Sequence, residues 1–386
     1  MRVPFSRSLI CASLMLTLAP AHADLSNIRI NGFGQVVGGT TFSNDHPSQG
    51  YGADPKFDQE SLYALQISAP LASKLTATAQ LVGKGTEDFK PKFEWAYVNY
   101  QFNNDWSIKA GRQRVPFFSY SDTLEVGVSL PWLRTPTSVY DVTGGFGNAD
   151  AVSLSYSHAF GNWQIDPELL FGQYSGGIKA EGIDGSLELK NLAGLALHAG
   201  YSDWLSLRAA YFVTRFGFHS PDFDGLVGAL DQSGFQGAGD ELATNGDTTT
   251  FLGFGAEINY AHWQVISEYV EFRANHSFIG DDHAYYLAIG RHFGRFLPMF
   301  TFGRANASSR CTALSQIPDV PQTQPLREAV STVIAAQVIH DSYYQFDLRY
   351  DLSNNVALKF NYTGTASSVA SRPSSNLLSA GVAYSF

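Results

Sequence analysis

The sequence is poor in cysteine and has no long apolar run in its main body. Of its 386 residues only two are cysteines, Cys11 and Cys311. Cys11 lies in an N-terminal segment that we expect to be removed, so one thiol remains and no internal disulfide is expected. Beyond Asp24 no stretch of about 18 apolar residues occurs, which argues against a membrane-spanning helix.

The sequence also lacks the motifs of common hydrolases and zinc enzymes. It contains no Gly-x-Ser-x-Gly, Ser-x-x-Lys or His-Glu-x-x-His. The histidines are dispersed without ligand spacing, and the acidic pairs Asp240-Glu241 and Asp281-Asp282 are better explained as solvated loop charge than as calcium ligands. We therefore predict no enzymatic activity, no metal and no other cofactor.

Residues 1–23 have the features of a secretory signal peptide. Two arginines precede an apolar run over 9–19, and Ala21-His22-Ala23 forms a small-residue cleavage site. The run is too short to span a bilayer, which favours a cleaved signal over a membrane anchor. Without the two leader arginines the chain keeps 23 basic and 35 acidic side chains, a net charge of −12. This balance argues against a nucleic-acid partner.

The C-terminal residues alternate between apolar and small polar side chains. In the last ten positions Leu378, Ala380, Val382, Tyr384 and Phe386 share one parity, and none of the ten is charged. This pattern predicts a β-strand whose apolar face continues to the final residue. An apolar environment must cover that face.

Short turns and long polar segments alternate along the chain. Seven short turns are expected, at 69–73, 102–106, 160–163, 201–204, 260–263, 293–296 and 352–355, and most of them are flanked by aromatic residues. The long segments are 43–57, 84–91, 115–149, 175–185, 217–247, 275–282, 305–341 and 366–375. Eight long loops and seven short turns require 16 strands, with both chain ends on the short-turn side.

The expected strands place charge on one parity. Over 343–352, Tyr344 and Phe346 alternate with Gln345 and Asp347. Charge facing lipid is costly, so this alternation predicts a transmembrane β-barrel with a wet interior. Strand 263–273 is the exception, because Glu268 and Glu271 have opposite parity, which predicts a bulge or a displaced boundary there.

The long segment 115–149 is too apolar to extend into water. Its apolar side chains are Leu124, Val126, Val128, Leu130, Trp132 and Leu133. Long loops with their own apolar residues pack against other parts of a protein. Folding inward against the barrel wall would bury these side chains and narrow the lumen.

In these features the chain resembles the Gram-negative outer-membrane porins. The resemblance rests on the signal peptide, the strand count, the long third loop and the terminal Tyr-Ser-Phe. The junction Lys-Ala-Gly-Arg-Gln-Arg-Val-Pro at 109–116 is similar to the same junction in that family. The Pro-Glu-Phe-Gly-Gly signature of well-known general porins is absent.

The resemblance implies a homotrimer surrounded by outer-membrane lipid, with 24–386 forming one barrel domain and both termini periplasmic. Tyr384 and Phe386 match the signal that the family presents to the barrel-assembly machinery. Segment 115–149 would be the constriction loop and 305–341 a long external loop.

The polar inner parity favours a channel for passive diffusion of small hydrophilic solutes and ions. A solute-specific porin, including an anion-selective one, is the alternative. An outer-membrane enzyme and an adhesin or structural barrel with a filled lumen are also considered, with less support.

Charge across the narrowing would set selectivity. The constriction residues that we predict are Lys109, Arg112, Arg114, Asp122, Glu125, Arg134 and Asp141. The predicted wall residues are Arg208, Asp166, Glu257, Asp347, Arg349 and Lys359. Each could instead be an ordinary solvated lumen or rim residue, because porin interiors are polar throughout. Arg112 and Arg114 have the parity opposite to Lys109, so all three point inward only with a bulge near Gly111.

Overall fold

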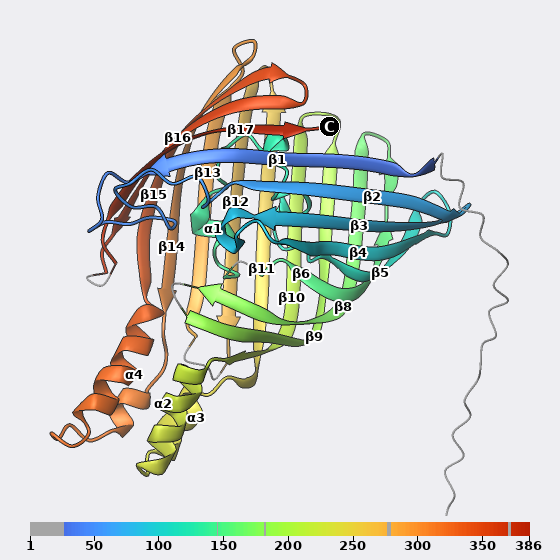
Figure 1. Ribbon diagram of the computed structural model, residues 1–386. Helices are drawn as coiled ribbons and strands as arrows, with labels where there is room; N and C mark the ends of the chain where they lie inside the picture. The colour runs from blue at the N-terminus through green and yellow to red at the C-terminus, as the bar shows by residue number, and fades with distance from the viewer. Residues whose placement is uncertain (1–26, 145, 181–182, 276–278, 370–371) are drawn as a thin grey trace, which may run out of the picture.

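The computed structural model describes residues 27–386 except 145, 181–182, 276–278 and 370–371, so the expected signal peptide lies outside the described residues. Over the described residues the chain forms a closed, antiparallel β-barrel of sixteen strands (Figure 1). This confirms the fold class that the alternation predicted. Among these residues no helix is both long and apolar enough to cross a membrane.

The first eight strand segments are β1 (Arg29–Thr40), β2 (Leu62–Ala72), β3 (Leu75–Lys84), β4 (Pro91–Gln101), β5 (Trp106–Arg114), β6 (Asn148–Tyr156), β7 (His158–Phe160) and β8 (Trp163–Ala180). The others are β9 (Ile183–Tyr201), β10 (Leu205–His219), β11 (Asn245–Tyr260), β12 (Trp263–Ala274), β13 (Asp281–Arg291), β14 (Phe296–Ser308), β15 (Ile339–Ser353), β16 (Val356–Ser367) and β17 (Ser375–Ser385). β6 and β7 both pair with β8 and form one barrel strand interrupted at Ser157.

The α-helices and 3₁₀ turns lie in the long loops. They are η2 (Gly85–Glu87), η3 (Ser121–Thr123), η4 (Gly127–Ser129), α1 (Thr137–Tyr140), α2 (Pro221–Gln232), α3 (Gln236–Leu242), η5 (Ala313–Gln316) and α4 (Gln324–Ala336). Figure 1 shows α2, α3 and α4 together beyond one end of the barrel. They share a small core that includes Leu230, Leu242, Ile317 and Val330.

One predicted loop is wrong. We expected a long loop at 175–185, but β8 and β9 continue through it and pair as far as Ala180 and Ile183. The segment contains Gly176 and Gly177, which are typical of turns. A β-ladder is held by backbone hydrogen bonds, so a glycine-rich segment can remain in it when the neighbouring strands are long.

The bulge expected in β12 is also absent. β12 pairs with β11 in an unbroken register from Trp263 to Ala274. Glu268 faces the interior and is 3% exposed. Glu271 lies on the other face, where it contacts Arg273 and accepts a hydrogen bond from Tyr269 at 3.2 Å. These partners, near the strand end, accommodate the carboxylate without a change of register.

Gly111 does not introduce a register shift either. β5 pairs regularly with both β4 and β6. The glycine has a φ of +128°, and an added Cβ would lie 2.3 Å from the carbonyl oxygen of Ala96. The position therefore requires glycine, but the faces of β5 keep alternating through it.

The barrel closes between β1 and β17. The Gly32 N–H donates to the Phe386 carbonyl at 2.9 Å, and the Phe386 N–H donates back at 2.8 Å. The Phe386 ring lies over Gly32, where a Cβ would be 2.2 Å from a ring carbon. The ring thus covers backbone that glycine leaves bare, an arrangement that pins strand register. The terminal apolar parity faces outward, with Leu378 48% exposed.

We predict that Phe386→Ala weakens closure of the barrel, because the Gly32 backbone loses its cover. The free energy of unfolding in urea should fall by about 1 kcal/mol or more, with less heat-modifiable barrel after refolding into lipid vesicles. Phe360→Ala on β16 is the matched control, since that ring is also exposed on the outer face, at 51%. Equal losses in the two variants would contradict the prediction.

Candidate functional site

Loop 3, defined as residues 115–147 between β5 and β6, folds into the barrel. Its Trp132 and Val139 are fully buried, and α1 within it packs against β13 and β14. In Figure 1, α1 lies within the outline of the barrel wall. The expectation of a third loop folded into the lumen is therefore confirmed.

Two properties of the sequence direct loop 3 inward. Leu130, Trp132 and Leu133 are at most 4% exposed. Burying apolar surface contributes about 25 cal/mol per Å², which favours contact with the wall over contact with water. Glycine in the wall permits a close approach, because a Cβ on Gly255 would lie 2.3 Å from the Ser119 hydroxyl oxygen.

The first group that fixes loop 3 is centred on Glu125, which is 8% exposed. Its carboxylate accepts from the Arg114 guanidinium and from the Lys84 ammonium, whose nitrogen lies 3.3 Å away. Lys84 lies at the same distance, 3.3 Å, from Glu94. Burial disfavours the charged form of Glu125, but attraction to Arg114 and Lys84 outweighs it and lowers the pKa of the Glu125 carboxyl.

The second group is centred on Glu268 of β12. Its carboxylate accepts hydrogen bonds from the Tyr140 hydroxyl at 2.6 Å, the Tyr286 hydroxyl at 2.7 Å and the Ser119 N–H at 2.8 Å. Burial and the Glu268 charge raise the pKa of Tyr140, so its phenol remains a donor. Glu268 therefore holds two separate parts of loop 3.

Neighbouring strands hold the same stretch of the loop. The Tyr120 hydroxyl donates to Glu257 on β11 at 2.7 Å, and the Arg208 guanidinium on β10 donates to the Pro116 carbonyl. Asp122 is exposed and attracts the Arg208 guanidinium electrostatically. Asp122 of loop 3 and Arg208 of the wall therefore attract each other across this part of the lumen.

Lys359 on β16 binds the middle of loop 3. Its ammonium, 3% exposed, donates to the carbonyls of Gly127, of Leu130 at 2.7 Å and of Trp132 at 2.5 Å. Arg349 on β15 donates to the same Leu130 carbonyl at 2.8 Å. An ammonium has three N–H donors, so Lys359 uses all of them on the loop backbone.

Asp347 on β15 satisfies the next part of the backbone. Its carboxylate accepts the Leu133 N–H at 3.1 Å and the Asn361 amide at 2.9 Å. One residue earlier, the Trp132 indole donates to the Thr301 hydroxyl at 3.0 Å. Loop 3 is therefore held to the barrel wall through both its backbone and its side chains.

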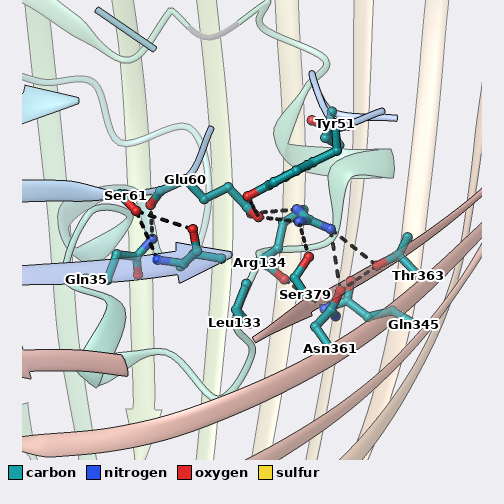
Figure 2. A network of polar contacts seen from close by, with 12 residues as sticks. Gln35, Tyr51, Glu60, Ser61, Leu133, Arg134, Gln345, Asn361, Thr363 and Ser379 are labelled. Carbon is teal, nitrogen blue, oxygen red and sulfur yellow. Dashed lines mark hydrogen bonds and ion pairs between the residues drawn. The ribbon is translucent and has the colours of Figure 1, made fainter. Parts of the chain in front are cut away.

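Arg134 connects loop 3 with loop 1 (residues 41–61) and the last two strands (Figure 2). Its guanidinium donates to Glu60 through two nitrogens, one of them 2.6 Å from the carboxylate, and to Ser379 at 3.2 Å. It also reaches Asn361 and Thr363, both at 3.4 Å. Arg134 is 8% exposed, so its charge is used mainly in these contacts.

Lys109 and Asp166 lie near short turns, each three residues beyond the tryptophan that begins its strand. Lys109 is 3.8 Å from Glu168, and Asp166 is 3.1 Å from a ring nitrogen of His198. Asp141, at the end of α1, is exposed and accepts a hydrogen bond from the side chain of Gln49 at 3.3 Å.

Arg112 is placed apart from the inner groups. It forms a two-pronged contact with Asp150, at 3.0 and 3.2 Å. Asp150 shares its strand face with Val152, which is 47% exposed, so the pair lies on the outer face. Arg114 has the same parity but ends β5 where the chain turns inward, and this lets its side chain reach Glu125.

Comparisons with known proteins agree with this geometry. A scan against protein-family models and a search of curated proteins both find no match. The structure is similar to the anion-selective porin from Comamonas acidovorans, with a TM-score of 0.56 and 13% identity over 93% of this chain and 99% of that chain. The channel DcaP of Acinetobacter baumannii gives 0.57 and 10%, covering 93% and 97%. The chain has the porin fold.

A third porin, Salmonella typhi OmpF in complex with daunomycin, has a TM-score of 0.54 and 12% identity, covering 93% of this chain and 97% of that chain. At these identities the likeness concerns the fold.

Several residues that fix the third loop of this porin barrel were not anticipated from sequence. They are Glu60, Lys84, Glu268, Tyr120 and Tyr140. Glu268 had a usable signal, since its parity conflicts with that of Glu271 in a strand that proves to be regular. Glu60 and Lys84 lie at the margins of loops, where the alternation of apolar and polar residues does not predict which way a side chain points.

We predict that Lys359→Met loosens loop 3 while the barrel remains closed. The carbonyls of Gly127, Leu130 and Trp132 each lose one donor, although Arg349 still donates to Leu130, and the loss should cost about 2–3 kcal/mol locally. Backbone amides over 126–133 should therefore exchange hydrogen faster by mass spectrometry. Lys74→Met is the control, since Lys74 donates to the Phe102 carbonyl at 2.7 Å at an exposed turn. Unchanged exchange over 126–133 would refute the role assigned to Lys359.

Proposed function

We propose that the protein is a porin of the Gram-negative outer membrane, through which small hydrophilic solutes and ions diffuse. The observation that carries this proposal is loop 3, which is fixed inside a closed barrel by buried polar contacts from many strands. A loop held in this way narrows a lumen to a constant size. It can therefore act as a size filter without a conformational step.

The outer surface supports a membrane location. Exposed apolar side chains cover the outward parity of the strands, for example Phe171, Phe254 and Phe300, each more than half exposed. At the short-turn end aromatic rings meet between neighbouring strands; the centroids of Trp163 and Tyr201 are 4.9 Å apart and those of Trp106 and Tyr156 are 4.8 Å apart. Aromatic girdles mark membrane–water interfaces.

We place both termini in the periplasm, because short turns face that side in bacterial barrels. The homotrimer and recognition of Tyr384 and Phe386 by the barrel-assembly machinery belong to the same proposal. The hydrogen bonds between Phe386 and Gly32 of β1 support the role of Phe386 in assembly, because the last residue takes part in closing the barrel.

Single-channel recording in planar bilayers tests the channel. Stepwise conductance increases, with a size-dependent exclusion of neutral sugars, are expected. A purified, folded barrel that produces no current would instead favour the structural barrel with a filled lumen.

We predict weak cation selectivity that strengthens at low salt. Two arginines at the loop form ion pairs, Arg114 with Glu125 and Arg134 with Glu60, whereas Asp122 is exposed. At about 0.15 M salt the Debye length is about 8 Å, so the vestibule charge of this acidic chain acts farther when salt is diluted.

Reversal potentials in a KCl gradient measure the preference. Asp122→Asn should reduce it, whereas Asp88→Asn should change it little, because Asp88 lies in loop 2 (residues 85–90) and its side chain is 84% exposed. Strong anion selectivity of the natural protein would show that the basic wall dominates.

Cys311 provides a test of topology. It lies in loop 7 (residues 309–338), and its thiol is 3.6 Å from Glu241. Burial and the nearby Glu241 carboxylate raise the pKa of the Cys311 thiol, so less of it is thiolate at neutral pH. An impermeant maleimide added to intact cells should label it slowly at pH 7 and faster as pH rises.

Glu241→Gln should lower the pKa of Cys311 and speed labelling at pH 7, while labelling at high pH changes less. Reaction only after cell lysis would reverse the proposed orientation.

A further inference from the structure

Arg112 and Asp150 form an ion pair on the outer face of the barrel. Two hydrogen bonds of 3.0 and 3.2 Å join the guanidinium of β5 to the carboxylate of β6. The Arg112 side chain is 38% exposed and that of Asp150 is 54% exposed. Val152, on the same face of β6, is 47% exposed. Both charges are therefore open to whatever surrounds the barrel.

The pair lies well inside the apolar band of the barrel. Arg112 comes six residues after Trp106, which is at the short-turn end of β5. With a rise of about 3.3 Å per residue and a strand tilt of about 40°, Arg112 is about 15 Å above that end, within a band about 25 Å tall. On β12 the first outward charge, Glu271, comes eight residues after Trp263. Arg112 is therefore nearer to the middle of the bilayer.

Small side chains beside the pair leave a hollow in the outer surface. Ala79 of β3 is opposite Ala96 of β4, and Ala96 is opposite Arg112, on strands that lie side by side in Figure 1. The hollow has a volume of about 400 Å³, and its other small side chains are Ala69, Ala77 and Ala110. Other strands present large outward side chains at such positions, for example Phe254 on β11 and Phe300 on β14, each 51% exposed.

Lipid covers this face poorly. Acyl chains offer Arg112 and Asp150 no hydrogen bonds, and charge near the middle of the hydrocarbon is costly. Where two proteins meet inside a membrane, small residues let their backbones approach closely, and polar side chains can bond across the contact. An ion pair beside a hollow lined by alanine therefore fits a protein surface better than it fits lipid.

We propose that the outward face of β3 to β6, around Arg112 and Asp150, is a contact surface between copies of this chain. The pair contains both signs of charge. When copies related by a rotation axis meet at this face, Arg112 of one copy can therefore face Asp150 of the next. This charge complementarity favours a second copy as the occupant. The inference rests on the proposed homotrimer and adds the face through which it forms.

Ala96→Trp fills the hollow and tests the contact. In the full-length protein extracted from outer membranes, the ratio of single barrels to oligomers in native mass spectrometry should rise at least about tenfold, because an overpacked contact cannot close. Ala256→Trp is the matched control, since Ala256 is on the outward parity of β11, between Phe254 and Ile258. It should leave the ratio unchanged. Heat modifiability on gels shows whether each variant is folded.

Photo-cross-linking identifies the occupant without filling the hollow. A p-benzoylphenylalanine in place of Val98, which borders the hollow and is 41% exposed, should join two copies when intact outer membranes are irradiated. The same residue in place of Ile258, which is 37% exposed on β11, should give adducts with lipid only. If Ala96→Trp does not fold, the cross-linking comparison decides alone.

An unchanged oligomer in a folded Ala96→Trp variant, or equal losses in Ala96→Trp and Ala256→Trp, would overturn the proposal. Cross-links from position 98 to lipid alone, or to a different protein, would do the same. Current is a separate readout, because each barrel encloses its own lumen. A natural protein that conducts as a single barrel would refute this contact and leave the diffusion channel standing.

Discussion

Every backbone group that loop 3 carries into the barrel must find a partner there, and this constraint shapes the interior. A loop on the surface can leave its carbonyls to water, but a loop packed against a wall cannot. Lys359 donates to three of these carbonyls, one of them shared with Arg349, and Asp347 accepts the Leu133 N–H. The charged residues of the wall are therefore largely structural, because most of their hydrogen bonds fix the position of loop 3.

The interior is divided by chemistry as a result. On β10 to β14 the inner face presents Phe212, Phe251, Ile266, Tyr286 and Met299, all at most 3% exposed. The opposite arc carries polar residues such as Gln80 on β3 and Asn361 on β16. Loop 3 packs apolar side chains on the first arc, where Glu268 and Arg208 also bind its backbone at Ser119 and Pro116, and it places the backbone of 127–133 against β15 and β16. A uniformly polar wall could bind the backbone but would not bury Trp132 or Val139.

Sequence reasoning succeeded where one physical rule acted alone. Alternation along β15 and β16 is governed by lipid on one side and the interior on the other, and the exposures of Tyr344 and Phe346, 46% and 50%, follow it. It failed where two rules compete. At 176–177 glycine is typical of turns, yet two long neighbouring strands keep it in the ladder.

The candidate site was less predictable because its residues come together through the path of loop 3. Alternation assigns a face within a strand, but it cannot say that Arg114 turns inward at the end of β5 while Arg112 pairs with Asp150 outside. Nor can it pair Arg134 with Glu60, which are 74 residues apart and both lie in loops.

The apolar arc also explains why an apolar cavity lies inside a barrel whose opposite arc is polar. Where both parities of a strand are apolar, as at Tyr211 and Phe212 on β10, lipid covers one and something else must cover the other. Loop 3 covers most of the inner arc, but Phe117 and Phe146 meet the wall without filling it, and the cavity is the remainder. The mainly apolar lining of the cavity offers ions few ligands. The polar residues of the interior therefore lie mainly on the opposite arc and at the exposed Asp122.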